Sequence, residues 1–587
     1  MHRLHARIDA WIDQDVRRSL LLALAALAGL CILVYLQQLG GLGLMDKTEG
    51  LFVEVPRQML VSGDWVTPRW NGEPFFDYPV WGYWMVGLSF RLFGVSEGAA
   101  RLPAALAAMA AVFGLFGLLM VVAPPGEAPH RRLGRATLTA TVLALSPGWI
   151  GWGRSSVTDM FLASAITLAL FGFALAHASP PDRPQQRRAG FVALALFCGV
   201  AVLAKGPVGL LLPGLVILAF WALKGTFLLG LRTTPWLALV ALFLGIAAPW
   251  YGLATQANGA EFLGRFLGFS NLERFTSVIY DHPGPPWFYL PWLLLLLLPW
   301  SLYLPVAAMR LRFWKLRSWR GADAPADLPL LALLWLVLMV VFFSAAATKL
   351  PGYILPVIPA GALLVGLLFM PLSDSSPLGL GLRISGWVNA GLLGLMAVAA
   401  VLAPRWLGQD PAYPDFAAAL ARSGLPLVLG LPLALAAGGL VLLLIQRPEA
   451  LRSLWTPNAA GVAVAVALVL PILVPLLDRE RQLPIRALAR LAADQAQPGE
   501  PLVVVGYKRY SVVFYSGRPV LFVTSARKAR RLLAERQQAP ASVLLLGSDL
   551  ELLEFGIGPG VGTPLARRDA HRLLRLPLSD LNRLEKN

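Results

Sequence analysis

The fold class of this chain is decided by an apolar run that reads Leu290-Pro291-Trp292-Leu293-Leu294-Leu295-Leu296-Leu297-Leu298-Pro299. Residues 330–343 form a second run without a charged side chain, and 57% of the 587 residues are hydrophobic. Segments of about 20 apolar residues cross the roughly 30 Å hydrocarbon core of a bilayer as helices. The sequence therefore predicts a polytopic α-helical membrane protein and argues against a soluble enzyme of this size.

The hydropathy pattern predicts about 13 transmembrane helices in residues 1–477. Residues 189–223 would form one helix about 50 Å long, so we expect a turn at Lys205-Gly206-Pro207 to divide them into two spans. Residues 80–93 are too short for a crossing and rich in aromatic side chains, which favours a helix that lies on the membrane surface. The expected spans are 19–39, 102–122, 136–150, 157–176, 191–204, 206–223, 235–251, 287–309, 328–347, 353–370, 384–401, 425–445 and 459–477.

The distribution of basic residues predicts how these spans are oriented. The net charge of +17 is spread over short loops, such as the one with Arg131, Arg132 and Arg135, and does not form one extended patch. This distribution argues against nucleic-acid binding, and the positive-inside rule assigns these loops and the N terminus to the cytoplasm. The first loop, Asp159 and the turns with Lys205 and Lys349 then all reach the outer, periplasmic face.

Residues 478–587 differ in character from the rest and predict a small external α/β domain. We expect helices at 483–496 and 526–537, strands at 502–505 and 543–546, and a hairpin formed by residues 512–514 and 520–523. The domain carries neither a glycine-rich phosphate loop nor a nucleophile motif. A structural or acceptor-docking role is therefore the favoured interpretation of this domain.

The first external loop, residues 44–101, holds twelve charged side chains in a protein that is only 14% charged, and we expect helices within it at the membrane surface. Asp46 and Glu49 are three residues apart and would project to one side of a helix, where a carboxylate can deprotonate an incoming acceptor. The alternative is that they cap the following helix. Asp159, at the start of the fourth span, is likewise either a functional acid or a helix cap.

Two lysines occupy tight turns that contain proline, on the same expected face as these acids. Lys205 and Lys349 either contact lipid phosphate nonspecifically or form a site for an anionic group, for which phosphate is the natural candidate at a membrane. Arg69 and Arg274 on external loops are further candidate cations. The residues alone thus predict a membrane enzyme that acts on a lipid-linked phosphate. The alternatives are a lipid-linked sugar flippase or transporter and a noncatalytic lipid-binding scaffold, although transporters usually place charges near the bilayer midplane.

Several short motifs are distributed over the whole membrane part of the chain. They are Asp46-Lys47-Thr48-Glu49 with Glu54, residues 62–74, Phe76-Asp77-Tyr78-Pro79, residues 92–103, Thr158-Asp159-Met160, Lys205-Gly206-Pro207, Glu273-Arg274-Phe275, residues 287–291 and residues 348–353 with Tyr353. In combination these motifs resemble the GT-C membrane glycosyltransferases, in particular the aminoarabinose lipid A transferase and protein O-mannosyltransferase group.

The resemblance implies a sugar donor on a polyprenyl phosphate and transfer with inversion to a lipid, glycan or protein acceptor on the outer face. The family base corresponds to Asp46 or Glu49, because the adjacent Asp-Glu pair of the family is stretched here, and Asp159 matches the second family acid. Leu51 stands where the family carries an arginine, and Tyr78 stands where it carries a lysine. Lys47, Lys205, Lys349 or Arg274 would compensate for the two missing cations.

The residues are accordingly assigned to three roles. Catalysis is assigned to Asp46, Glu49 and Asp159; binding of the donor phosphate to Lys47, Lys205, Lys349, Arg274 and Arg69; and the substrate pocket to Tyr78, Glu54 and Tyr353. The sequence indicates no certain cofactor, no metal ligands and no nucleic-acid partner, and it leaves open whether a divalent cation assists. We expect a monomer. Cys31 and Cys198 fall in expected spans, where they are expected to be buried apolar side chains.

Overall fold

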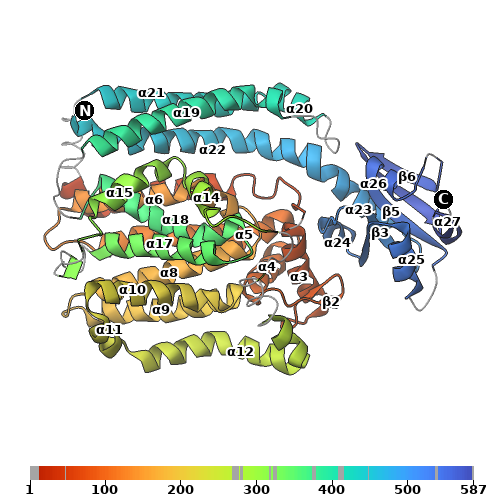
Figure 1. Ribbon diagram of the computed structural model, residues 1–587, viewed down its shortest axis with the longest axis horizontal. Coiled ribbons are helices and arrows are strands. Elements are labelled where there is room, and N and C mark those ends of the chain that lie inside the picture. Colours follow the sequence, from red (N-terminus) through yellow and green to blue (C-terminus); the bar gives the residue numbers. More distant parts are fainter. Residues whose placement is uncertain are drawn as a thin grey trace.

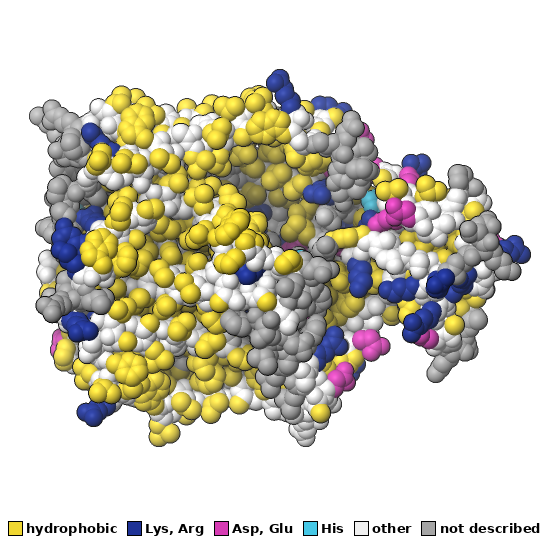
Figure 2. All heavy atoms as spheres, viewed as in Figure 1, with side chains coloured by type: hydrophobic (Ala, Val, Ile, Leu, Met, Phe, Trp, Pro, Cys, Tyr) yellow, Lys and Arg dark blue, Asp and Glu magenta, His cyan; other side chains and the backbone are white. Residues whose placement is uncertain are grey.

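The computed structural model describes residues 12–584 except 47, 267–276, 278–281, 316–318, 321–326, 373–378, 408–414, 447, 536–539 and 559. Roughly parallel helices form one body, and a small domain of sheet and helix lies at one end of it (Figure 1). Hydrophobic side chains cover the flank of the helical body (Figure 2). Such an apolar surface is expected of a body that faces lipid.

Ten helices in the described part of the chain are long and apolar enough to cross a membrane. Their number and length agree with the expected integral-membrane architecture. They are α2 with the π-helical turn η1 (Val16–Cys31, Ile32–Leu36), α5 (Glu97–Val121), α8 (Thr158–Ala178), α9 (Pro184–Lys205), α12 (Trp236–Leu263), α17 (Leu328–Ala345), η5 with α18 (Pro351–Val357, Ile358–Phe369), α19 (Leu380–Trp406), α21 (Leu425–Ile445), and α22 with its continuation (Trp455–Leu477).

Two of the thirteen expected spans are divided or bent, and a third is a single helix that is shorter than the ten above. Residues 136–150 are divided between α6 (Pro129–Ala144) and α7 (Pro147–Gly153), because Pro147 cannot continue the helix that precedes it. Helix α10 (Val208–Lys224) has 17 residues. Residues 287–309 form a pair bent by 110°, α14 (Tyr289–Leu296) and the helix made of η3 (Trp300–Tyr303) and α15 (Leu304–Arg310); counting this pair as one span gives eleven.

Small residues allow the central helices to approach closely. A side-chain carbon at Gly190 of α9 would lie 2.5 Å from the backbone nitrogen of Ala176 on α8, and one at Gly172 would lie 2.7 Å from the carbonyl of Gly190. Helices in membranes use such small residues for backbone contact. Around this centre, α19, α21 and α22 form a separate layer on one side, and α12 lies on the other side (Figure 1). The short helix α11 (Phe227–Thr233) connects α10 to α12, and the short helix α20 (Phe416–Arg422) connects α19 to α21.

The first loop folds at the end of the body that faces the small domain (Figure 1). It contains helix α3 (Glu49–Ser62) and helix α4 (Trp81–Phe93), which has 13 residues and is too short for a crossing. Between them, strands β1 (Arg69–Trp70) and β2 (Glu73–Pro74) pair antiparallel. Asn71 and Gly72 both have positive φ, as this tight Asn-Gly turn requires.

The small domain is built on a five-stranded sheet with the order β4-β3-β5-β7-β6. Strand β3 is parallel to β4 and β5, whereas β7 is antiparallel to β5 and β6. The bounds are α23 (Leu483–Gln495), β3 (Leu502–Val505), α24 (Ser511–Ser516), β4 (Val520–Val523), α25 (Ala526–Ala534), β5 (Ser542–Ser548), α26 (Asp549–Glu554), β6 (Thr563–Arg568), β7 (His571–Pro577) and α27 (Leu578–Arg583).

The expected hairpin of residues 512–514 and 520–523 is wrong. Residues 512–514 lie in helix α24, which ends at Gly517 in the left-handed conformation, and β4 runs parallel to β3. Parallel neighbours need a crossover of about a dozen residues, which α24 and its flanking turns supply. A run of three apolar residues is too short to distinguish a helical turn from a strand. The other expected helices and strands of this domain are present at the expected places.

One continuous helical segment connects the two parts. Helix α22 passes through a π-helical turn, η7 (Asp478–Gln482), directly into α23, whose apolar face packs on the sheet. The small domain is therefore attached to the end of a membrane helix without an intervening flexible linker.

Candidate functional site

An ion pair at the end of the body next to the small domain joins two of the expected site residues. Lys205 is the last residue of α9, and Asp159 lies in the first turn of α8; the lysine ammonium donates a hydrogen bond to Asp159 Oδ1. The chain can leave α9 here because Gly206 has a φ of 89°. An acid in a first turn and a base in a last turn also complement the helix dipoles.

Two tyrosine rings flank the Lys205 ammonium. Its Nζ lies 4.8 Å from the ring centroid of Tyr353 and 5.9 Å from that of Tyr78, within range of cation–π attraction. Tyr353 comes from η5, and Tyr78 comes from the loop between β2 and α4. The structure thus brings together four expected site residues from four distant segments. Side-chain exposure of 12% for Lys205 and 20% for Asp159 leaves the pair in contact with solvent.

Lys349 lies four residues before Tyr353, in the turn that leads into η5. Its side chain is 7% exposed and its ammonium donates to the carbonyl of Ala346 at 2.6 Å. The backbone N–H of Lys349 donates to the carbonyl of His282, and a carbon on Gly284 would lie 2.8 Å from Lys349 Cδ. The loop that precedes α14 therefore packs on this lysine. The second cation, Lys349, is thus held just before η5, the helix that supplies Tyr353 to the Lys205 site.

Glu49 is a saturated structural carboxylate. It is fully buried and accepts Nε of Arg101 at 2.8 Å and the terminal nitrogen of Arg101 at 2.7 Å. The N–H groups of Met45 and Ser156 fill its remaining acceptor positions. Burial alone would raise the pKa of Glu49, but Arg101 and these N–H donors reverse the effect, and its pKa lies below the ordinary value. Glu49 therefore ties the start of α3 to α5 and to the loop before α8.

Asp46 lies at the contact with the small domain. Its Oδ1 accepts the backbone N–H of Ser511, the first residue of α24, at 2.9 Å. A side-chain carbon on Gly50 would lie 2.5 Å from that same nitrogen, so only glycine allows this close approach. Burial raises the pKa of the Asp46 carboxyl, against the opposing effects of Ser511 and Arg509. A carboxyl with a raised pKa is suited to accept a proton.

The remaining expected residues are less central in the described structure. Glu54 is fully buried and accepts two hydrogen bonds of 2.6 Å from Arg57 and one of 2.8 Å from Gln58. Arg69 is half-buried in β1. Lys47 and Arg274 lie outside the described residues.

Two residues were not assigned a role from sequence and are prominent in the structure. Arg101 holds Glu49 and also donates to the carbonyls of Leu39, Leu42 and Gly43. Its position in the first turns of an apolar span is the sequence feature that could have identified Arg101. Asp77 is 9% exposed and its Oδ1 lies 3.9 Å from Nε of Arg265, next to the Tyr78 wall.

The arrangement can bind an anion and accept a proton. Lys205 and Lys349 supply positive charge among aromatic and apolar groups, where charge–charge attraction is stronger than in water. Asp46 supplies a carboxyl with a raised pKa. Within the described ranges, no three His, Cys, Asp or Glu side chains gather closely enough to hold a metal ion.

Two protein-family models match separate parts of this chain. Residues 77–252 match the family model described as dolichyl-phosphate-mannose-protein mannosyltransferase, and residues 495–587 match the C-terminal domain of the cyanobacterial RgtA-type glycosyltransferases. In the crystal structure of ArnT from Cupriavidus metallidurans bound to undecaprenyl phosphate, 97% of that chain superimposes on 94% of this one, with a TM-score of 0.73 and 25% identity. This chain has the GT-C glycosyltransferase fold.

Curated proteins with the name undecaprenyl phosphate-alpha-4-amino-4-deoxy-L-arabinose arabinosyl transferase are also similar. The one from Shewanella sediminis is 32% identical over 63% of this chain and 64% of its own length. The one from Pseudomonas aeruginosa is 34% identical over 63% of both chains. The match thus spans less than two thirds of the length of these relatives. The expected resemblance to the aminoarabinose transferase and O-mannosyltransferase group is confirmed.

Each of the two matched regions contains some of the candidate site residues. The first model covers Tyr78, Asp159 and Lys205, and the second covers Ser511, which holds Asp46. The ion pair therefore lies in the region that matches the first model, and Ser511, the partner of Asp46, lies in the region that matches the second.

Proposed function

We propose that this chain is an integral-membrane glycosyltransferase that moves a sugar from a polyprenyl-phosphate donor to an acceptor on the outer face of the inner membrane. The observation that carries the proposal is the Lys205 ammonium, held by Asp159 between the rings of Tyr78 and Tyr353. The relatives named as undecaprenyl-phosphate aminoarabinose transferases support the donor class. Undecaprenyl phosphate bound to the similar ArnT chain supports it independently.

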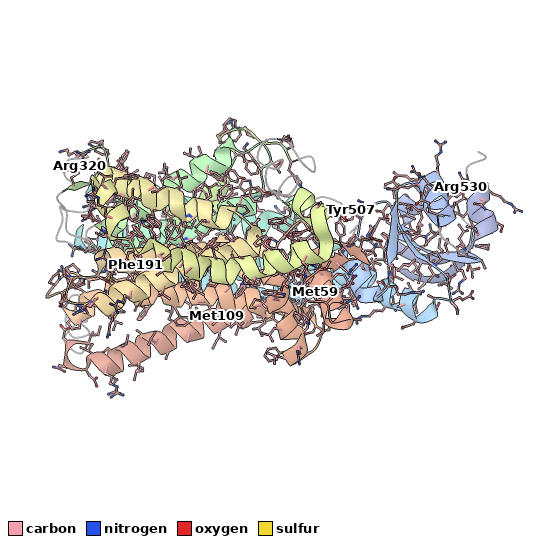
Figure 3. All side chains as sticks on the ribbon, turned by 90° about the horizontal axis from the view of Figure 1, so that it is seen from below. Met59, Met109, Phe191, Arg320, Tyr507 and Arg530 are labelled. Atoms are coloured by element: carbon pink, nitrogen blue, oxygen red, sulfur yellow. The ribbon has the colours of Figure 1, made fainter. Side chains whose placement is uncertain are left out.

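The orientation is part of the proposal. The site and the small domain face the periplasm, and the N terminus faces the cytoplasm. Arg320 lies at the end of the body opposite the small domain (Figure 3), as the positive-inside rule requires of a cytoplasmic loop. We likewise propose residues 1–477 as the membrane domain, with residues 44–101 as its external loop, residues 478–587 as the external domain, and a monomeric state.

The reaction we propose is a single displacement with inversion. An acceptor hydroxyl oxygen attacks the anomeric carbon, its proton passes to a carboxylate, and the bond from the anomeric carbon to the phosphate oxygen breaks. Asp46 is favoured over Glu49 as the base, because the acceptor positions of Glu49 are already filled. Lys205 and Lys349 stabilise the polyprenyl phosphate as it leaves with its additional negative charge.

Asp159 is proposed to act through Lys205. Its carboxylate fixes the ammonium between the two rings, so that the cation is in place before the donor arrives. The family resemblance implies a lysine at the position of Tyr78, and the Tyr78 ring lines the site beside Lys205. A donor whose sugar stacks on tyrosine fits such a site.

The test is transfer of labelled sugar from polyprenyl phosphate to a lipid acceptor by the purified full chain in detergent. Lys205→Ala should reduce transfer by about 10²–10³, whereas Arg320→Gln at the opposite end should not change it. A flippase needs two compartments and a scaffold has no turnover, so transfer in detergent distinguishes the enzyme from both. Absence of transfer from every polyprenyl-phosphate sugar, with donor still bound, would overturn the proposal.

A further inference from the structure

The turn between β3 and α24, residues 506–510, is the part of the small domain that reaches the first loop. Tyr507 marks its place, where the small domain adjoins the helical body (Figure 3). The residue that follows the turn, Ser511, donates its backbone N–H to Asp46. A side-chain carbon on Gly50 would lie 2.9 Å from Cα of Ser511, so α3 and the small domain are in backbone contact here. A hydrogen bond from the small domain therefore fixes the candidate base.

Two further contacts join the first loop to the same segment of the small domain. The hydroxyl of Tyr515 in α24 accepts the N–H of Leu44 at 2.7 Å. The side-chain amide of Asn71 forms two hydrogen bonds with the backbone of Val520, of 2.8 Å and 3.0 Å. The turn therefore lies inside a fixed interface, and a change in its conformation would displace the N–H of Ser511.

Glu551 of α26 fixes the conformation of this turn. Its Oε1 accepts the backbone N–H of Tyr507 at 2.9 Å and a terminal nitrogen of Arg509 at 3.1 Å. Its Oε2 lies 3.0 Å from the other terminal nitrogen of Arg509. Gly506 has a φ of 77°, and a side-chain carbon there would lie 2.6 Å from Cγ of Glu551. Glu551 is itself held by the capping box that it forms with Ser548, so the turn is anchored to a helix end.

Arg509 is the buried cation of this cluster. It is 8% exposed, and its paired contact with Glu551 is the geometry in which arginine binds a carboxylate most strongly. It also donates to Nε2 of His571 at 3.2 Å and to the carbonyl of Tyr507 at 3.4 Å. Burial and the nearby Arg509 charge lower the pKa of His571 to about 4, so the imidazole is neutral above that pH. Arg509 therefore connects α26, β7 and the turn.

The same arginine affects the charge state of Asp46. Burial raises the pKa of the Asp46 carboxyl, and the hydrogen bond from Ser511 and the charge of Arg509 oppose that effect. Burial also raises the pKa of the nearby tyrosines Tyr510 and Tyr515, which are neutral where a carboxyl titrates. The other charged groups around the start of the first loop are paired with one another, Glu49 with Arg101, and Glu97 and Asp478 with Arg486. Loss of the Arg509 charge would therefore raise the pKa of Asp46 further.

We propose that Arg509 is a positioning residue for sugar transfer. Together with Glu551, it fixes the turn that carries the N–H of Ser511. That N–H then holds the Asp46 carboxylate in the position from which it takes the proton of the acceptor. This inference rests on the proposed function, in which Asp46 is the base, and it makes the small domain part of the catalytic unit.

Sugar transfer by the purified full chain in detergent, measured over a range of pH, tests the proposal. Arg509→Gln should lower the turnover number about 10–100-fold and leave the KM for the donor unchanged, because a displaced base affects the reaction and not donor binding. The fall in transfer at acidic pH should move to higher pH, since the pKa of Asp46 rises. An unchanged turnover number or an unchanged pH dependence in this variant would overturn the proposal.

A conservative variant separates the charge of Arg509 from its hydrogen bonds. Arg509→Lys keeps a positive charge but cannot form the paired contact with Glu551. It should restore the pH at which transfer falls more fully than it restores the turnover number. If Arg509→Gln does not fold, Arg509→Gln/Glu551→Gln takes its place with the same expected fall in turnover, because it leaves no unpaired charge and glutamine can keep the capping box.

Arg575→Gln is the matched control. Arg575 makes the same kind of paired contact with Glu500, at 2.8 Å and 3.1 Å, in the same domain but at the opposite end of β3. The variant should lower the unfolding temperature as Arg509→Gln does and change neither the turnover number nor the pH dependence. An equal fall in turnover in both variants would mean that any loosening of the small domain reduces transfer, and would overturn the proposal.

Hydrogen exchange separates this proposal from the proposed function. On the full chain without substrate, the amide of Ser511 should exchange about tenfold faster in Arg509→Gln and at the original rate in Arg575→Gln. A chain that transfers no sugar and still shows this faster exchange would contradict the enzyme but keep the hold of Arg509 on the turn. A chain that loses transfer in Asp46→Asn and keeps it in Arg509→Gln would contradict the positioning role alone.

Discussion

Two ion pairs at the same end of the molecule have the same chemistry and opposite surroundings. Glu49 and Arg101 are buried, and every acceptor position of the carboxylate is filled by protein. Lys205 and Asp159 remain partly exposed, and the ammonium faces two aromatic rings. The Glu49–Arg101 pair holds segments together, and its carboxylate has no free acceptor position for a ligand. The partly exposed Lys205–Asp159 pair, which is flanked by two tyrosine rings, can bind a ligand.

The largest expected effect comes from breaking the saturated pair. Glu49→Ala leaves Arg101 buried without its counter-charge and should lower the free energy of unfolding by about 3–5 kcal/mol. Thermal unfolding of the purified chain in detergent measures this loss. The matched control is the double variant Glu49→Leu/Arg101→Met, which removes both charges and should recover much of the stability. A single variant as stable as the original chain would contradict the structural role.

Breaking the unsaturated pair should affect activity more than stability. Lys205→Ala should reduce the turnover number for sugar transfer by about 10²–10³, because it removes a cation that faces the departing phosphate. The same preparation should unfold at nearly the original temperature. Lys205→Arg, which keeps the charge, should retain more activity than Lys205→Ala. A large drop in the unfolding temperature with unchanged turnover would show that the Lys205–Asp159 pair serves structure and not catalysis.

Protonation of Asp46 should cause the fall in sugar transfer on the acidic side of the pH profile, which is called the acidic limb here. Burial raises the pKa of its carboxyl, and a base acts only when deprotonated, so transfer should fall as the pH drops through this raised pKa. Asp46→Asn keeps the shape of the side chain, should lower transfer by about 10²–10⁴ and should remove this limb from the residual activity. An unchanged pH profile in the variant would assign the limb to another group.

The smallest expected effect concerns an ion pair in open solvent. Arg531 and Glu535 on the small domain are 82% and 60% exposed and lie 3.5 Å apart. Exposed pairs contribute little, because water and salt screen them. Arg531→Gln should therefore change neither the unfolding temperature nor transfer. A measurable loss of either would indicate that exposure is a poor guide to the role of ion pairs in this chain.

Much of the fold was predictable because its signal is local. The long apolar runs, the short aromatic helix α4 and the break after Lys205 each depend on neighbouring residues and on the thickness of a bilayer. The hairpin prediction failed because three apolar residues fit either a strand or a turn of helix. The bend between α14 and α15 was not predicted, since both halves are equally apolar.

The candidate site was predicted as a set of residues but not as an arrangement. Asp159, Lys205, Tyr78 and Tyr353 do come together, whereas Glu54 is bound within its own helix by Arg57. Asp46 and Glu49 are equivalent in the sequence, three residues apart after an apolar span. The structure separates them, because Arg101 saturates Glu49 while Ser511 holds Asp46.

The sequence by itself determined the membrane architecture, the approximate positions of most helices and the kinds of side chain at the site, since hydropathy and turn chemistry act over a few residues. Only the tertiary structure decided which carboxylate is saturated and which is not. That decision depends on partners 52 and 465 positions away, Arg101 for Glu49 and Ser511 for Asp46. Whether a buried charge serves structure or chemistry is set by the hydrogen bonds that distant segments bring to it.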